Sequence, residues 1–139
     1  MLLLVFLLNN IKIGIPLEEV AYIADNVYNI DTAMASEHIR GTTILREEVV
    51  PIYSLKSRFG YEGQIDGEMV VVVEQEDKKL GLEVGRIEGI KYMEEFVFSE
   101  IPPIIEKGEL CIKHAISYQG EIILVLDVEK IVAEYKTDN

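Results

Sequence analysis

Two histidines, one cysteine and several acidic pairs are the side chains of this sequence that could do chemistry. His114 follows Cys111 by three positions inside a predicted strand, so the two side chains point to opposite faces and form no Cys–His dyad. No His or Cys spacing resembles a zinc site, and no glycine-rich phosphate loop is present. We therefore expect a packed Cys111, a surface His114 and no metal.

The carboxylates also give little sign of an active site. They occur mostly as adjacent pairs at predicted turns and helix faces, where their ordinary role is solubility: Glu18-Glu19, Glu47-Glu48, Glu76-Asp77 and Glu94-Glu95. Asp127 has a simpler role as the N-cap of a helix. We therefore do not expect an enzyme.

The trio Arg46-Glu47-Glu48 separates two apolar runs. One interpretation is the polar tip of a β-hairpin. The other is a docking surface, because an Arg at the rim of an apolar surface buries its stem and presents a planar fork of donors. The second half of the chain resembles the first, as described below, and Gly120 is the residue there that is equivalent to Glu47. A Glu in the left-handed conformation of a tight turn costs on the order of 1 kcal/mol, unless the turn takes another form.

Composition narrows the class of protein further. The length of 139 residues fits a single domain, 1–139, and 49% hydrophobic residues suffice for a core. The net charge of −12 argues against binding to nucleic acid or to anionic lipid. The single cysteine fits a reducing cytoplasm.

The first ten residues, MLLLVFLLNN, resemble a signal peptide only superficially. They lack a basic start and a small-residue cleavage site, and the apolar run is far shorter than the about 20 residues that span a bilayer. We interpret the run as a buried β-strand.

Four strand-turn-strand units follow one another along the chain, which predicts a small β-barrel or sandwich. Their turns are Asn9-Asn10, Arg46-Glu47-Glu48, Glu76 to Lys79, and Gln119-Gly120. Two helices are also predicted: a short one after Pro16, over LEEVAYIA, and a C-terminal one capped by Asp127. The apolar face of the latter is formed by Val128, Ile131, Val132 and Tyr135.

The two halves of the chain are similar to each other. A shift of 67 positions places Gly14 on Gly81, Val20 on Ile87 and Ile23 on Ile90. A shift of 73 places Val49-Val50 on Ile122-Ile123. We infer two similar β lobes of two hairpins each, with a groove between them.

The stretch IRGTTILREEVVPIYSLKSRFG resembles the core signature of CheW-like domains. Matching positions are Gly41, Leu45, Arg46, Val49, Val50, Pro51, Leu55 and Gly60. The segments MVVVVEQEDKKLGLEVGRIEGI and GEIILVLDVEKIV resemble later parts of the same pattern, so the resemblance covers nearly the whole chain.

This resemblance implies a fold of two intertwined five-stranded SH3-like β-barrel lobes with a C-terminal helix. We expect residues 11–65 in the first lobe and 66–139 in the second, with 1–10 as a candidate completion of the second. The resemblance also implies a cytoplasmic scaffold protein of chemotaxis signal transduction, which has no catalytic activity, needs no cofactor and does not insert into the membrane. Such an adaptor couples chemoreceptors to a CheA-type histidine kinase: the receptor's cytoplasmic hairpin tip docks between the lobes, and lobe ends pair with the kinase regulatory domain.

The resemblance assigns receptor or kinase binding to Val20, Gly41, Arg46 and Glu47. Glu47 stands where the family has Gly, and Gly85 where the second half normally has Asp, so specificity is expected to differ from that of relatives. The alternative function is a small-molecule-sensing or regulatory domain that uses the groove between the lobes as a pocket.

Overall fold

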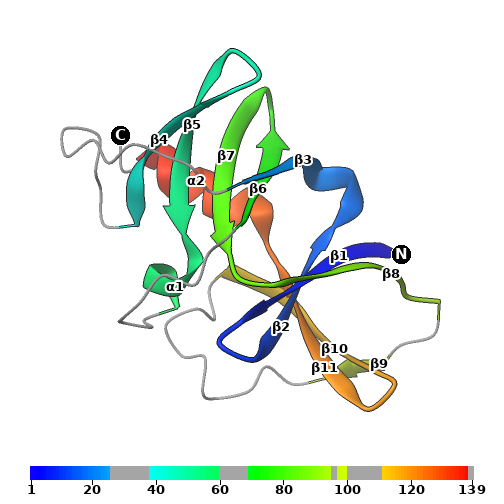
Figure 1. Cartoon of the computed structure of the whole chain (residues 1–139). Coiled ribbons are helices and arrows are strands. Elements are labelled where there is room, and N and C mark those ends of the chain that lie inside the picture. Colours follow the sequence, from blue (N-terminus) through cyan, green and yellow to red (C-terminus); the bar gives the residue numbers. More distant parts are fainter. Residues whose placement is uncertain (26–37, 60–68, 95–96, 100–110, 138–139) are drawn as a thin grey trace.

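The computed structural model describes residues 1–25, 38–59, 69–94, 97–99 and 111–137 (Figure 1). The described chain forms two β-sheets and a C-terminal helix, so the prediction of a mainly β fold with this helix is confirmed. The predicted lobe boundary at residues 65 and 66 lies outside the described residues, as does Gly60.

One sheet has six strands and the other has five. The six-stranded sheet contains Leu2–Leu8 (β1), Ile11–Pro16 (β2), Ile87–Tyr92 (β8), Val97–Ser99 (β9), Ile112–Tyr118 (β10) and Glu121–Leu126 (β11), in the order β8-β1-β2-β11-β10-β9. The five-stranded sheet contains Val20–Asp25 (β3), Ile39–Leu45 (β4), Glu48–Ser54 (β5), Met69–Gln75 (β6) and Lys78–Val84 (β7), in the order β3-β6-β7-β5-β4. The helices are the 3-10 helix η1 (Leu17–Glu19), α1 (Leu55–Arg58) and α2 (Val128–Thr137).

All four predicted hairpins are present, and each closes through a turn with two central residues at positive φ. These pairs are Asn9-Asn10, Arg46-Glu47, Glu76-Asp77 and Gln119-Gly120, with φ between 48° and 79°. Positive φ at both central positions defines the type I′ turn, whose twist matches that of the flanking strands. The charged trio therefore contributes Arg46 and Glu47 to the turn, while Glu48 begins β5.

The repeat in the sequence corresponds to a repeat in strand pairing. In one sheet β11 lies parallel to β2, and in the other β5 lies parallel to β7. The other strand pairs of the two sheets also correspond. The order β8-β1-β2-β11-β10 in one sheet matches, position by position, the order β3-β6-β7-β5-β4 in the other. In addition, β3 follows β2 along the chain but pairs with β6, and β8 follows β7 but pairs with β1. The sheets thus exchange one strand each, which makes the lobes intertwined; β9 is a sixth strand beyond the five predicted.

The central strands are buried on both faces. Leu4, Phe6 and Leu8 of β1 join a core cluster shared by both sheets and α2, whereas Leu3 and Val5 join a cluster within the six-stranded sheet. Alternate side chains of a strand point to opposite faces, so a strand between two cores is apolar throughout. This explains the continuous N-terminal apolar run and confirms its interpretation as a strand.

The prediction of a helix over LEEVAYIA is wrong. Only η1 is helical there, and from Val20 onward the chain forms β3, in which half-buried and exposed residues alternate. Pairing with β6 decides this conformation, so tertiary context overrides the local preference. The C-terminal helix is confirmed, and it lies behind the five-stranded sheet in Figure 1. As predicted, Asp127 caps it: the backbone N–H of Lys130 donates to Asp127 Oδ1 at 3.1 Å.

Candidate functional site

Arg46 and Glu47 form the tip of the β4–β5 hairpin, and both side chains are exposed. Their φ angles are 51° and 67°, so Glu47 does occupy the left-handed conformation that Gly120 has in the equivalent hairpin. The next residue, Glu48, accepts hydrogen bonds from Lys79 Nζ at 2.9 and 3.0 Å. This hydrogen bond raises the pKa of Lys79. Glu48 is thus the carboxylate of the trio that pairs with Lys79, and Glu47 is an exposed carboxylate at the hairpin tip.

The Arg46 guanidinium stacks on the ring of Tyr22, with its central carbon 3.9 Å from the ring centroid. Tyr22 lies on β3 and Arg46 follows β4, and these strands are the two edges of the five-stranded sheet. The sheet must curl for the edges to meet, and Arg46 covers the opening of the resulting barrel. An exposed cation–π contact of this kind stabilises by about 0.5–1 kcal/mol.

The Tyr22 ring packs against the inner cluster of this barrel, which contains Val50, Ile52, Val70 and Val72. Its hydroxyl is buried and has no hydrogen-bond partner in the described part of the chain. Nothing in the sequence pointed to Tyr22, because the pairing that brings β3 to this sheet is made by a strand distant in the sequence.

The other two predicted site residues occupy different environments. Gly41 is buried in β4, next to the register shift between Ile39 and Gly41 and opposite Ile52. Val20 begins β3, is half-buried, and packs on the shared core. Arg46 and Glu47 are thus the exposed members of the predicted set, and the binding roles of all four remain predictions.

Two exposed apolar side chains, Ile44 and Val49, lie beside the tip and are named here the tip patch. They face each other across the β4–β5 ladder, and they are 72% and 67% exposed. Sequence reasoning missed them as surface residues. The signal was available, because Leu45 and Val50 point inward, and strand alternation then places Ile44 and Val49 on the outer face.

A second apolar surface follows the edge strands β3 and β8. Ile23 stands opposite Val71, and Ile90 stands opposite Leu4. Both partners belong to the shared core, so Ile23 and Ile90 lie on the faces that the two sheets turn toward each other. They are exposed because no further strand covers these edges. With Leu2 and Tyr92, which pair across β1 and β8, they form what is named here the edge row: Leu2, Ile23, Ile90 and Tyr92.

Arg58, Glu134 and Tyr53 form a partly buried polar cluster with a structural role. Arg58 donates from Nε and Nη2 to the two Glu134 carboxylate oxygens at 3.0 and 2.9 Å, which ties α1 to α2. The Tyr53 hydroxyl donates to the same carboxylate at 3.4 Å, and burial raises the pKa of Tyr53. Beside this cluster, His38 Nδ1 and the Ser57 hydroxyl lie 2.9 Å apart in an exposed contact.

Cys111 is fully buried, as predicted, and burial raises the pKa of its thiol to about 12. His114 is half-buried instead of fully exposed, and its ring packs on Phe98 with centroids 5.1 Å apart. Within the described ranges, no group of three or more His, Cys, Asp or Glu side chains could hold a metal ion. No helix in that same part of the chain is long and apolar enough to cross a membrane.

Comparisons with known proteins agree with this geometry. The family model of the CheW-like domain matches residues 2–136. Among solved structures, the crystal structure of the scaffolding protein TtCheW from Thermoanaerobacter tengcongensis is similar with a TM-score of 0.77. That similarity covers 90% of this chain and 82% of that chain at 22% sequence identity, and so concerns the fold. A search of curated proteins finds no match.

Proposed function

The chain belongs to the CheW-like domain family, and we propose from this premise that it is a non-catalytic scaffold that couples chemoreceptors to a CheA-type histidine kinase. The observation that carries the proposal is the family match over residues 2–136, because it includes both lobes and the Arg46 motif. In this role the protein would work in the cytoplasm and need no cofactor.

The edge row supports a receptor contact between the lobes. Ile23 and Ile90 are 41% and 59% exposed on the faces that flank the shared core. A helical hairpin presents an apolar stripe at helical spacing, and such a stripe fits an apolar groove between two elements. Val20 precedes this row on β3 and would support it from within.

The tip of the β4–β5 hairpin supports a second contact, at a lobe end. The tip patch supplies apolar area, and Arg46 supplies the kind of charged donor that is enriched among interface hot spots. We assign the tip patch to the kinase regulatory domain, whereas Arg46 and Glu47 at its rim select among receptor or kinase partners. Glu47 adds a negative charge where relatives are expected to have Gly, so a partner of this protein would carry a basic group at the matching position.

The test is a titration of the full chain with the kinase regulatory domain and with receptor cytoplasmic fragments from the same organism. Arg46→Ala should weaken partner binding about tenfold or more, the size of a moderate hot spot. Its melting temperature should fall by only about 2–4 °C, because the Tyr22 contact contributes at most about 1 kcal/mol. Lys130→Ala, which removes an exposed charge on α2, is the matched control and should change neither quantity.

Two further variants separate the surfaces. Ile44→Ser should impair kinase binding and spare the receptor, and Ile90→Ser should do the reverse. No binding by the unmodified chain to any kinase or receptor fragment of that organism would refute the scaffold proposal. A drop of 10 °C in Arg46→Ala, by contrast, would mean that Arg46 acts as a structural residue.

A further inference from the structure

The contact between Arg46 and Tyr22 closes the seam of the five-stranded sheet, which is the side of the barrel between its edge strands β3 and β4. Among the described residues, β3 pairs only with β6 and β4 only with β5, so no ladder hydrogen bond crosses this seam. The guanidinium of Arg46, 3.9 Å from the centre of the Tyr22 ring, makes a contact between side chains alone. The seam can therefore open without loss of a ladder hydrogen bond.

The second lobe has no counterpart of this pair. The shift of 67 positions relates Tyr22 to Gly89, and strand pairing places both residues at the register shift of an edge strand. The shift of 73 relates Arg46 to Gln119, and both have a φ of 51°. The Gln119 amide donates to the hydroxyl of its neighbour Tyr118 at 3.3 Å. The fold therefore requires neither the ring nor the guanidinium, and the pair is a feature of the first lobe alone.

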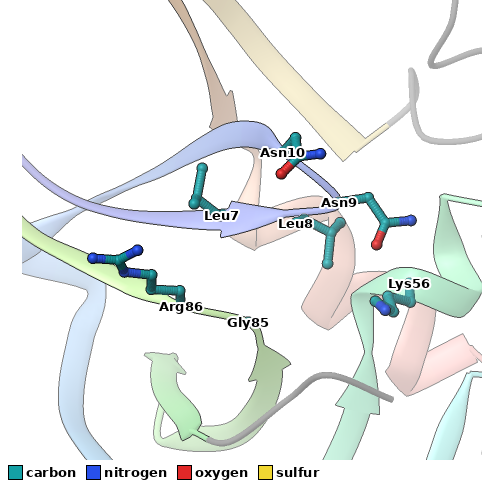
Figure 2. Close-up of a pocket in the computed structure, with 7 residues that line it drawn as sticks. All are labelled: Leu7, Leu8, Asn9, Asn10, Lys56, Gly85 and Arg86. Carbon is teal, nitrogen blue, oxygen red and sulfur yellow. The ribbon is translucent and has the colours of Figure 1, made fainter. Parts of the chain in front are cut away.

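The equivalent edge strand of the other sheet, β8, is held near both ends by backbone hydrogen bonds. Beside the pocket drawn in Figure 2, the Leu7 N–H donates to the Arg86 carbonyl oxygen at 2.8 Å. At the other end of β8, the Met93 N–H donates to the Met1 carbonyl oxygen at 2.7 Å. From Tyr22 onward, β3 makes no backbone bond beyond its ladder to other described residues. Of the two edge strands, β3 is thus the one whose position depends on a side-chain contact.

The closed seam carries a cost at the Tyr22 hydroxyl. This group is buried without a hydrogen-bond partner among the residues that the structure describes, and such burial opposes the closed state. A phenylalanine would present the same ring face to Arg46 without this cost. If the ring turns outward, the stack is lost but the hydroxyl gains hydrogen bonds to water. The closed and open arrangements therefore lie close in free energy, as in an element with two states.

Tyr22 also connects the two surfaces proposed for partners. On β3 it precedes Ile23 of the edge row, and strand alternation turns the Tyr22 ring into the barrel and Ile23 toward the other sheet. A ligand on the edge row fixes β3 and so holds the ring under the Arg46 guanidinium. The guanidinium stacks through its face, which leaves its in-plane N–H groups able to donate. A fixed ring thus orients Arg46 for a carboxylate of a partner at the hairpin tip.

We propose that the Arg46–Tyr22 stack is a latch on this seam, which couples a ligand on the edge row to a ligand at the hairpin tip. Each ligand favours the closed latch and therefore strengthens the binding of the other by the same factor. This factor is limited by the stack itself, about 0.5–1 kcal/mol, and is about two- to fivefold. The identity of the ligands, receptor and kinase, rests on the proposed function, whereas the latch is a property of the protein alone.

The first experiment measures hydrogen exchange of backbone amides by NMR in the full chain without partners. Arg46→Ala removes the latch, and Glu47→Ala is the matched control because it truncates the exposed neighbour at the same tip. In Arg46→Ala, the β3 amides should exchange about two- to fivefold faster, while those of the β1–β2 hairpin stay unchanged. Glu47→Ala should change neither group. Unchanged exchange in β3, or equal acceleration throughout the chain, overturns the proposal.

The second experiment measures affinity for the kinase regulatory domain with and without a saturating receptor fragment, by calorimetric titration. The unmodified chain should bind the kinase domain about two- to fivefold more tightly when the receptor fragment is present. Tyr22→Phe keeps the ring and should keep this factor, whereas Tyr22→Leu should abolish it. A factor that survives Tyr22→Leu, or no factor in an unmodified chain that binds both partners, overturns the coupling. If the unmodified chain binds neither partner, the scaffold proposal fails, and the exchange experiment still decides whether the latch exists.

Discussion

The turn residues Glu47 and Gly120 permit a direct measurement of backbone strain at the candidate site. They occupy equivalent positions in equivalent hairpins, with φ of 67° and 79°. Neither position involves packing: Glu47 is exposed, and a Cβ at Gly120 would meet nothing within 4 Å. Exchange of the two residue types therefore changes the free energy of unfolding mainly through the backbone.

The left-handed conformation costs a non-glycine residue about 1–2 kcal/mol. Glycine loses about 0.5–1 kcal/mol more conformational entropy on folding than a residue with a side chain. The difference predicts that Glu47→Gly stabilises the fold by about 0.5–1 kcal/mol and that Gly120→Glu destabilises it by a similar amount. For a chain of this length the two melting temperatures should move by about 2–4 °C in opposite directions.

Urea unfolding of both single variants and of the double exchange measures these changes. The double variant should return to the stability of the unmodified chain, because the tips lie in different sheets and do not share partners. Glu47→Ala is the control, since it removes the carboxylate and keeps the Cβ, and it should leave stability within about 0.5 kcal/mol. If Glu47→Gly lowered stability, the strain at this turn would be smaller than a glycine's entropy loss, and the reasoning would fail.

Further predictions concern two packed glycines, the ion pair between α1 and α2, and the buried thiol. Gly81→Ala should cost about 1–3 kcal/mol in urea unfolding, because its Cβ would lie 2.8 Å from Val70 Cγ1 and 2.9 Å from Ile52 Cδ1. The equivalent Gly14→Ala, with contacts of 3.1 Å, should cost clearly less, and equal losses would contradict the explanation. Glu134→Ala should cost about 1–3 kcal/mol because it leaves Arg58 without its bidentate partner, whereas Tyr53→Phe should cost less than about 0.5 kcal/mol since its bond is long at 3.4 Å. The pKa of Cys111, raised from 9.0 to about 12, predicts a native thiol that does not react with Ellman's reagent at pH 8. Because the folded state holds this proton more tightly, its contribution to stability is complete below pH 9 and is lost as pH rises toward 12, by about 1 kcal/mol at pH 10. Cys111→Ala should remove that part of the pH dependence, and a native thiol that reacts as fast as the unfolded one would refute it.

The sequence was sufficient to predict the local units of the fold. Apolar runs and two-residue turns predict the four hairpins. Asp127, together with the spacing of Val128, Ile131 and Val132, predicts the C-terminal helix. The exchange of β3 and β8 between sheets was not predictable from local patterns, because edge-strand pairing depends on partners about 50 to 90 residues away. The helix predicted after Pro16 is absent for the same reason, because pairing with the distant strand β6 holds these residues in strand β3.

The candidate site also combines features that local sequence predicts with features that depend on distant contacts. The motif around Arg46 located the hairpin tip, and the repeat identified Glu47 as an anomaly. The stacking of Arg46 on Tyr22 and the edge row depend on contacts between distant strands.

The strand exchange also has a consequence for the order of events on the ribosome. The neighbour β8 of β1 is made about 85 residues after β1, and the strand β11 beside β2 is made about 120 residues after it. At about 5–20 residues per second, the β1–β2 hairpin waits roughly 6–24 seconds before its sheet is complete. Until β10 and β11 are made, Leu3 and Val5 of the run LLLVFLL lack the side chains of those strands that cover them in the finished molecule. Nascent chains halted before β11 should therefore recruit chaperones that recognise apolar strands, and release from them should coincide with the synthesis of the last hairpin.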